Sequence, residues 1–354
     1  MHRKAKSRIH RPLERDCLPR PGQRGVKTGG KTMRTITYGQ AVKEAISEEM
    51  TRDERVFTLG LDLGYGGEHG ILVGLAEAFG RDRVRDTPIS EDAIIGTALG
   101  ASCTGCRAIA DVPFNEFLII GMDQVYNQAA KFRYMFGSAV KVPMVIRTAI
   151  GGYITAGPQH SQCLEAWFAH VPGLISICPS TPYDVKGMLK TAIRNDNPVI
   201  CFEHKKLYSM KGEVPQEEYL LPLGKADVKR EGKDVTVVAY SFALQQALKV
   251  AERLAGKVSV EIVDPRSLNP LDMDTILASV QKTRRVLIVH EAWKTGGFGG
   301  EIAARIADEG FRFLKAPVKR LGAKDFPIPF ARCLEDFILP QEQDIEKAIV
   351  ELAG

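Results

Sequence analysis

Short apolar runs alternate with longer helical patterns along most of this chain, and this alternation constrains the fold more than any other feature. Between residues 39 and 204 the apolar spacing predicts helices, for example at 39–53, 117–135 and 181–195, with buried strands between them. Those strands are expected at 55–63, 107–114, 142–150, 174–180 and 198–204. Parallel strands need long crossover connections, which such helices supply. The sequence therefore predicts an α/β protein whose sheets are mostly parallel, with helices on both faces.

A polar, turn-rich stretch divides this alternation into two parts. Residues 205–234 are interpreted as a connector. We therefore expect a first α/β domain at 34–204 and a second, smaller α/β domain at 235–354. The remaining residues, 1–33, are expected to form a basic, disordered extension.

That extension carries an unusual share of the positive charge. The first 34 residues contain eleven Lys and Arg against only Glu14 and Asp16, whereas the formal net charge of the whole chain is +5. A start rich in Arg and poor in acid also suits a nucleic-acid-binding arm or a transit peptide. A plainer alternative is translation from an upstream start, with Met33 as the natural beginning. We favour a disordered extension or translation from an upstream start, and we expect no nucleic-acid partner.

Composition narrows the class of protein further. Hydrophobic residues make up 44% of the chain and charged residues 26%, as in soluble globular proteins. No apolar stretch approaches the roughly 20 residues that span a bilayer, so no membrane partner is expected. The seven cysteines are scattered and do not form a secreted disulfide pattern. We therefore expect a cytoplasmic protein.

Two residues stand out as candidates for proton transfer. Within the run 86–101, Glu91 lies between a Pro-containing turn and an apolar, small-residue segment that is interpreted as a helix. Loss of water disfavours the charged form of a carboxyl group and raises its pKa, which suits proton transfer near neutrality. His160 lies in a Gly/Pro/Gln loop, 156–163, from which a side chain can point into a cleft. On the residues alone, Glu91 can equally satisfy local backbone donors, so both remain candidates.

Other motifs are better explained by structure than by chemistry. The segment 295–307, TGGFGGEIAARIA, invites a dinucleotide-loop interpretation, but Ile302 stands where the last glycine of G-x-G-x-x-G belongs. We interpret it as a strand-to-helix turn. Cys103 and Cys106 form a C-x-x-C on a segment expected to be helical, with no second pair for zinc. The motifs of common hydrolases and NTPases are missing from the chain.

Several longer motifs, in fixed order, carry a resemblance to a known family. They are RVRDTPISE (83–91), DQVYNQAAKFRYMFG (123–137), QHSQCLEAWFAHVPGL (159–174) and VDPRSLNPLD (263–272). From about Met33 onwards, the chain resembles the beta subunit of the decarboxylating component of thiamine-diphosphate-dependent 2-oxo acid dehydrogenases. This is a transketolase-like family whose members act on pyruvate, branched-chain 2-oxo acids or acetoin. KFRYMFG, CPSTPYDVKG and FEHKKLYSMKGEVP are most similar to the acetoin branch, and the substrate stays open.

The resemblance implies a fold and particular roles. It implies a pyrimidine-binding domain followed by a transketolase C-terminal-like domain. Glu91 matches the glutamate that hydrogen-bonds the ring nitrogen of the cofactor's aminopyrimidine. Phe117 matches an aromatic residue against the pyrimidine, although an ordinary core aromatic is the alternative. His160 matches the histidine that handles protons on the substrate-derived intermediate or the incoming lipoyl group.

The resemblance also implies a potassium site and contains one departure. Main-chain carbonyls hold potassium in relatives, at positions that match Met144, Ala192, Ile193, Asn195 and Asn197. Asn195 replaces the more usual aspartate. Many relatives carry a glutamate at the position of Leu61, where it is linked to proton communication between paired active sites. A leucine side chain cannot relay a proton, so the resemblance does not carry this part of the family mechanism over to this chain.

The chain has no GDG…N segment of the kind that holds magnesium and the cofactor diphosphate. In two-chain members that segment belongs to the alpha subunit, so this chain alone is expected to be inactive. The implied assembly is an alpha2-beta2 heterotetramer that binds a lipoyl-bearing acyltransferase core. The enzyme would decarboxylate a 2-oxo acid or cleave acetoin, then transfer the acyl group to lipoyllysine. The alternatives are half of a two-chain transketolase-like enzyme and a non-catalytic scaffold subunit.

Overall fold

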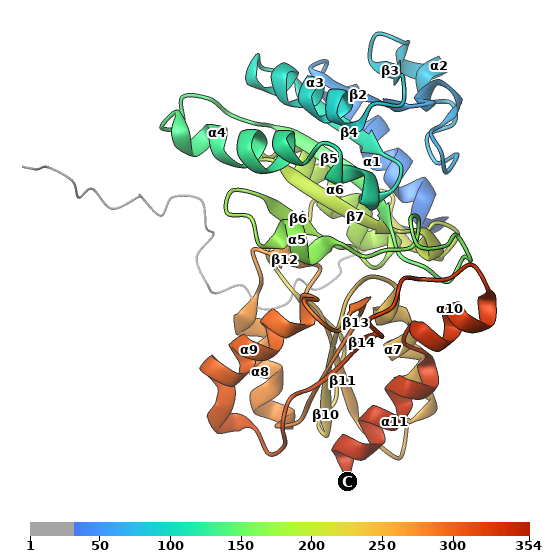
Figure 1. The fold of residues 1–354 in the computed structure, drawn as a ribbon, viewed down its shortest axis with the longest axis vertical. Coiled ribbons are helices and arrows are strands. Elements are labelled where there is room, and N and C mark those ends of the chain that lie inside the picture. Colours follow the sequence, from blue (N-terminus) through green and yellow to red (C-terminus); the bar gives the residue numbers. More distant parts are fainter. Residues whose placement is uncertain (1–31) are drawn as a thin grey trace, which may run out of the picture.

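The computed structural model describes residues 32–354, and Figure 1 shows two domains stacked along the long axis. Most of the predicted basic extension, residues 1–31, lies outside the described residues. Its last part does not match the expectation, because Met33 is the first residue of a strand, β1 (Met33–Thr37). β1 pairs antiparallel with β8 (Lys211–Pro215), which lies in the segment interpreted as a connector.

The first domain is built on a seven-stranded sheet in the order β12-β6-β7-β5-β4-β2-β3. Six of its strands are parallel: β2 (Val56–Leu61), β3 (Val84–Thr87), β4 (Arg107–Val112), β5 (Met144–Ile150), β6 (Ile175–Ile177) and β7 (Val199–His204). Five of them were predicted, and β3 was missed. The seventh strand, β12 (Ser267–Asn269), comes from the other half of the chain and is antiparallel to β6. Its addition ties the two halves of the chain together.

Helices cover both faces of this sheet. They are α1 (Tyr38–Arg52), α2 (Leu75–Phe79), α3 (Glu91–Cys103), α4 (Ala130–Met135), α5 (Glu165–Ala169) and α6 (Pro182–Arg194). Along β4, Ile109 packs into the core beneath α1 and α6, whereas Ala108 and Ala110 pack into the core beneath α3. This alternation follows from the two-residue period of a strand that is buried on both faces.

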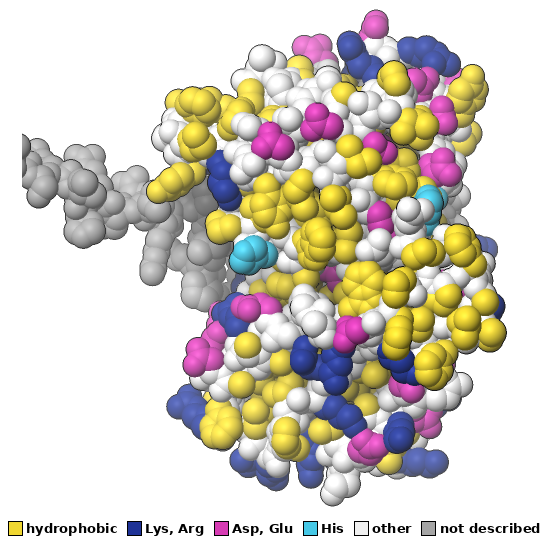
Figure 2. Space-filling view, in the orientation of Figure 1, with side chains coloured by type: hydrophobic (Ala, Val, Ile, Leu, Met, Phe, Trp, Pro, Cys, Tyr) yellow, Lys and Arg dark blue, Asp and Glu magenta, His cyan; other side chains and the backbone are white. Residues whose placement is uncertain are grey.

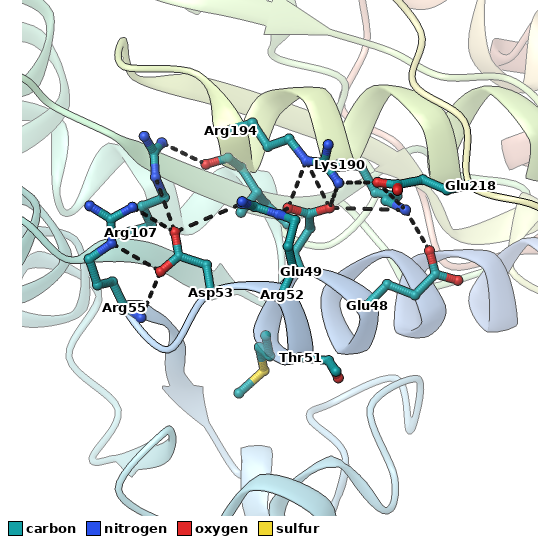
Figure 3. Close-up of polar contacts among 12 residues, drawn as sticks. Glu48, Glu49, Thr51, Arg52, Asp53, Arg55, Arg107, Lys190, Arg194 and Glu218 are labelled. Carbon is teal, nitrogen blue, oxygen red and sulfur yellow. Dashed lines mark hydrogen bonds and ion pairs between the residues drawn. The ribbon is translucent and has the colours of Figure 1, made fainter.

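Ion pairs reinforce the contact between α1 and α6, as Figure 3 shows. The buried Glu49 accepts hydrogen bonds from the Arg194 guanidinium, at 2.7 Å from Nη2. Lys190 is also buried, and its Nζ lies 2.6 Å from Glu48. Charges buried at this depth need such partners, because an unpaired charge would cost several kcal/mol, by an order-of-magnitude estimate.

The second domain has a five-stranded sheet in the order β14-β13-β10-β11-β9. Its strands are β9 (Asp227–Arg230), β10 (Val235–Ala239), β11 (Val260–Asp264), β13 (Val286–Trp293) and β14 (Lys319–Ala323), and only β9 is antiparallel to its neighbour. Its helices are α7 (Ser241–Arg253), α8 (Met273–Thr283), α9 (Gly299–Gly310), α10 (Arg332–Ile338) and α11 (Glu342–Ala353). α8 and α9 pack on the face whose apolar core continues into the first domain. The two-domain α/β prediction is therefore confirmed.

One predicted helix is wrong in form. The segment 117–135 was expected to be a single helix, but it is divided into a 3-10 helix (Asn115–Ile119), a π-helix (Gln124–Ala129) and α4. Gly121 lies at the break and packs on the first turn of α3: a Cβ there would come within 2.5 Å of the Ile95 side chain. The bend at Gly121 brings this segment against the N-terminus of α3, where the candidate site begins.

Candidate functional site

Glu91 is the first residue of α3, directly after β3 and the turn that contains Pro88. Its side chain is only 7% exposed. Ser90 does not cap the helix through its side chain, and within residues 32–354 no hydrogen bond or ion pair joins the Glu91 carboxylate to another residue. The free N–H groups of the first turn and the helix dipole favour a negative charge here. The alternative, that the carboxylate satisfies local backbone donors, therefore has no hydrogen bond among the described residues to support it.

Phe117 and His160, which are 43 residues apart in the sequence, lie together in the structure. Their ring centroids are 5.6 Å apart with perpendicular planes. Phe114 completes the group, because its ring meets the His160 imidazole edge-on at 4.6 Å and lies 5.9 Å from Phe117. Perpendicular packing places the positive edge of one ring against the face of the other. The imidazole is therefore held by apolar rings, while its side chain remains partly exposed.

Gly121 connects this aromatic group to Glu91. A Cβ added at Gly121 would lie 3.4 Å from the main-chain oxygen of Glu91, so the two backbones are close. Phe117 is four residues before Gly121 in the same segment. The segment that carries Phe117 therefore packs on the first turn of α3, which begins at Glu91, and Phe117 in turn contacts the imidazole of His160. Such a set of a carboxylate, an aromatic ring and an imidazole can position an aromatic heterocycle and move protons near it.

Three further residues around this site were missed by sequence reasoning: Asn115, Glu116 and Lys205. The Glu116 carboxylate accepts a hydrogen bond from the Gln162 N–H at 2.6 Å, and burial raises its pKa. Lys205 donates from Nζ to the His160 carbonyl at 2.6 Å. The only sequence signal was the presence of polar residues directly after buried strands, and their partners are 45 and 46 residues distant.

Three of the five carbonyls proposed for potassium, those of Ala192, Ile193 and Asn195, already accept hydrogen bonds from donors within the chain. Nη1 of Arg107 donates to the carbonyls of Ile193 and Asn195, at 3.0 Å each. The Ala192 carbonyl accepts from the Asn195 N–H at 3.1 Å. The Arg107 guanidinium also bonds Asp196 at 2.9 Å, and Figure 3 shows its place beside Asp53. The turn therefore gathers carbonyls around a positive charge, and in this structure the charge belongs to Arg107.

The other sequence candidates have structural surroundings. Leu61 is the last residue of β2 and is partly exposed. Cys103 ends α3, whereas Cys106 lies in the following turn rather than on the helix, and both are free thiols. The glycines of the 295–307 segment enclose His290: a Cβ at Gly297 or Gly299 would collide with the imidazole. This packing explains the glycine-rich turn without a dinucleotide.

A large hollow on the described residues lies away from the side chains of the candidate site. It has a volume of about 830 Å³, is lined by α5 and the start of α9, and does not include Glu91, Phe117 or His160. Among residues 32–354, no helix has the length and apolar character needed to cross a membrane.

Comparisons of this chain with known proteins show the family to which it belongs. Residues 34–211 match the transketolase pyrimidine-binding domain, and residues 224–345 match the transketolase C-terminal domain. The chain is 45% identical to the beta subunit of acetoin:2,6-dichlorophenolindophenol oxidoreductase from Bacillus subtilis, over 91% of this chain and 98% of the relative. It is 44% identical to the 2-oxoisovalerate dehydrogenase beta subunit of the same organism, over 91% of this chain and 99% of the relative.

Another relative and a solved structure point to the same family and fold. Identity is 42% to the beta subunit of the pyruvate dehydrogenase E1 component of Chaetosphaeridium globosum, over 90% of this chain and 99% of the relative. A solved structure described as a split-gene transketolase, inactive beta4 tetramer, has a TM-score of 0.74 at 23% identity and covers 90% of this chain and 98% of its own; it supports the fold alone. The chain belongs to the transketolase-like family of beta subunits from the thiamine-diphosphate-dependent acetoin and 2-oxo acid dehydrogenases.

Proposed function

We propose that this chain binds the pyrimidine end of thiamine diphosphate through Glu91 and Phe117, and that His160 moves protons at the reacting end. The observation that carries the proposal is the Glu91 carboxylate: nearly buried, without a hydrogen bond to another described residue, and four residues from the end of a parallel strand. The carboxylate oxygens are not among the enclosed, unpartnered polar atoms of the described residues, so they keep contact with solvent, and a ligand can reach them and supply a partner. These residues fit an aminopyrimidine, which offers a ring nitrogen and an aromatic face.

The bound cofactor would supply the electron sink for breaking a carbon–carbon bond. The protein residues have simpler tasks. Glu91 holds or releases a proton at the pyrimidine ring nitrogen, Phe117 covers the ring, and the imidazole of His160 accepts or donates protons beside the substrate. The substrate in this proposal is a pyruvate-like 2-oxo acid or acetoin, and the acyl group passes to lipoyllysine of an acyltransferase core.

A partner subunit would complete the site. Apolar side chains on both sides of Glu91 face solvent: Ile89 is 75% exposed and Ile120 is 59% exposed. Figure 2 shows hydrophobic side chains gathered across the middle of the face that it draws and over the region of α10. Clustered exposed apolar residues mark interaction sites. In the proposal an alpha subunit covers this face in an alpha2-beta2 assembly and brings magnesium with the cofactor diphosphate.

We also propose a potassium site at the turn 192–197, on the condition that potassium displaces the Arg107 guanidinium. The carbonyls of Ile193 and Asn195 converge on a cationic nitrogen, which supports a cation-binding turn. Because Arg107 supplies that nitrogen, potassium would compete with the guanidinium for the carbonyls. We assign potassium no part in the chemistry. The cytoplasm is the proposed location, and free thiols at all six cysteines of the described part agree with a reducing compartment.

Reconstitution tests the proposed function. The chain is mixed with an alpha subunit, thiamine diphosphate, Mg²⁺ and a lipoyl domain, and acyl-lipoyl formation is measured by mass for pyruvate, branched-chain 2-oxo acids and acetoin. Acyl-lipoyl that appears only when both subunits are present supports the proposal. Ketol transfer to an aldose phosphate would favour a transketolase-like half-enzyme. A complex that binds its partner but turns over none of these substrates would favour a scaffold subunit.

A further inference from the structure

The loop that carries His160 has no regular secondary structure, so contacts from other segments must fix it. On the side after His160, Asn115 accepts from the Leu164 N–H at 2.9 Å and donates to the Gln162 carbonyl at 3.1 Å. Glu116 accepts from the Gln162 N–H at 2.6 Å. These bonds hold the residues that follow His160, whereas the His160 N–H bonds within its own loop, to the Gly157 carbonyl at 3.4 Å, so the main chain of His160 has no support from another segment on that side.

Lys205 supplies this support from the opposite side. It begins a 3-10 turn (Lys205–Leu207) directly after β7, and its Nζ donates to the His160 carbonyl at 2.6 Å. The same ammonium lies 5.2 Å from the centroid of Phe114, the ring that packs edge-on against the imidazole. One cation therefore contacts both the backbone of His160 and the ring that orients its side chain.

The surroundings of Lys205 show that this placement is not simple core packing. Lys205 is only 9% exposed, and burial lowers its pKa, whereas the carboxyl groups of Glu116, Glu291 and Glu335 act in the opposite direction and help it keep its proton. An apolar side chain of similar length would fill the space without the desolvation cost of a buried charge. The feature that only Lys205 contributes is the charged donor to the His160 loop.

We propose that Lys205 is a positioning residue for His160, fixing the imidazole where it exchanges protons with the substrate or the lipoyl group. The inference rests on the proposed function, because it assigns Lys205 no contact with either. A displacement of about 1 Å at a reacting group can lower a rate by roughly 100-fold. Loss of Lys205 should therefore act on kcat, with little change in KM, since the substrate-binding surface stays in place.

A double-mutant cycle on the reconstituted two-subunit enzyme tests this role. The variants are Lys205→Met, His160→Ala and their combination, with Lys206→Met as the matched control because Lys206 is the exposed neighbour. If Lys205 acts through His160, Lys205→Met lowers kcat for acyl-lipoyl formation on the order of 100-fold in the wild-type background. It then has almost no further effect once His160 is alanine. Lys206→Met should leave kcat unchanged.

The outcomes separate the two proposals. Full activity of His160→Ala would remove the role of His160 and with it this part of the proposed function. A strong effect of His160→Ala combined with an additive or negligible effect of Lys205→Met would overturn only the positioning role. If Lys205→Met does not assemble with the alpha subunit, Lys205→Arg carries the same cycle: it keeps the charge but alters the donor's reach, and an additive effect contradicts the inference.

Discussion

Nε2 of His204 lies 2.6 Å from Oε2 of Glu291, and this buried contact joins the last residue of β7 to the sheet of the second domain. Nδ1 of His204 accepts the Lys206 N–H at 3.0 Å, so Nε2 carries the proton that Glu291 accepts. Glu291 also accepts the Gly152 N–H at 2.5 Å. The carboxylate thus links both domains beneath the candidate site.

Removal of this carboxylate should destabilise the domain junction. Glu291→Ala leaves two buried donors without an acceptor, and we expect it to lower the free energy of unfolding by about 2–4 kcal/mol. Glu291→Gln keeps an acceptor and should lose less than half of that. Urea unfolding followed by circular dichroism measures both values. Equal midpoints for Glu291→Ala and the wild type would show that the contact contributes nothing.

Glu165 makes stability depend on pH. Its side chain is buried at the start of α5, where burial raises its pKa to about 7, although the Tyr240 hydroxyl donates to it at 2.8 Å. An unfolded glutamate loses its proton near pH 4.5. Unfolding therefore releases a proton between these values, and stability is lost as the pH rises from about 4.5 to 7.

Glu165→Gln should remove this dependence. The difference in unfolding free energy between the variant and the wild type should grow in favour of the variant by up to about 1.4 kcal/mol per pH unit through this window. Other titrating groups cancel in the difference. Glu252→Gln, on an exposed position of α7, serves as the control and should show no such trend. If the difference in unfolding free energy between Glu165→Gln and the wild type does not change with pH, Glu165 is ionised in the folded protein across this whole window.

Competition at the carbonyl cluster gives a prediction about potassium. Because Arg107 already donates to Ile193 and Asn195, KCl should raise the melting temperature of the wild type no more than choline chloride of equal ionic strength. In Arg107→Met the carbonyls lose their cationic donor, so KCl should stabilise that variant specifically. Differential scanning fluorimetry in both salts measures the effect. Specific stabilisation of the wild type alone would contradict the competition.

The exposed apolar surface near Glu91 predicts where the partner binds. Ile120→Asp would bury a charge in the proposed interface and should raise the dissociation constant for the alpha subunit by roughly 10- to 100-fold. Val350→Asp is the matched control, because Val350 is 50% exposed on α11 at the far end of the second domain, as Figure 1 shows for that helix. Analytical ultracentrifugation of the mixed subunits measures both constants. Equal weakening by the two substitutions would place the partner elsewhere.

The fold class was predictable because strands buried on both faces have continuous apolar sequences, and α1 and α6 have clear helical spacing. Local patterns could not reveal β12, a three-residue strand that joins the sheet of the other half of the chain. They also missed β8 and β9, whose polar sequences form strands because each pairs with a strand distant in sequence. Tertiary contact overrides propensity in such segments.

The candidate site shows the same division. Glu91, Phe117 and His160 were predicted from local sequence and from the family resemblance, and two of them contact each other in the structure. Glu116 and Lys205 were missed because their partners, Gln162 and the His160 carbonyl, are set by the fold and not by neighbouring residues. The break at Gly121 was missed because it depends on the close approach of α3.

The Glu91 carboxyl group is the centre of the proposed function, and its direct test is the exchange of the thiazolium C2 proton of bound thiamine diphosphate into D₂O. In the reconstituted enzyme, Glu91→Gln should slow this exchange by about 10²- to 10⁴-fold, the usual contribution of a positioned acid or base. Asp92→Asn, the exposed next residue, should exchange at the wild-type rate. An unchanged exchange rate in Glu91→Gln, with the cofactor bound, would contradict the account.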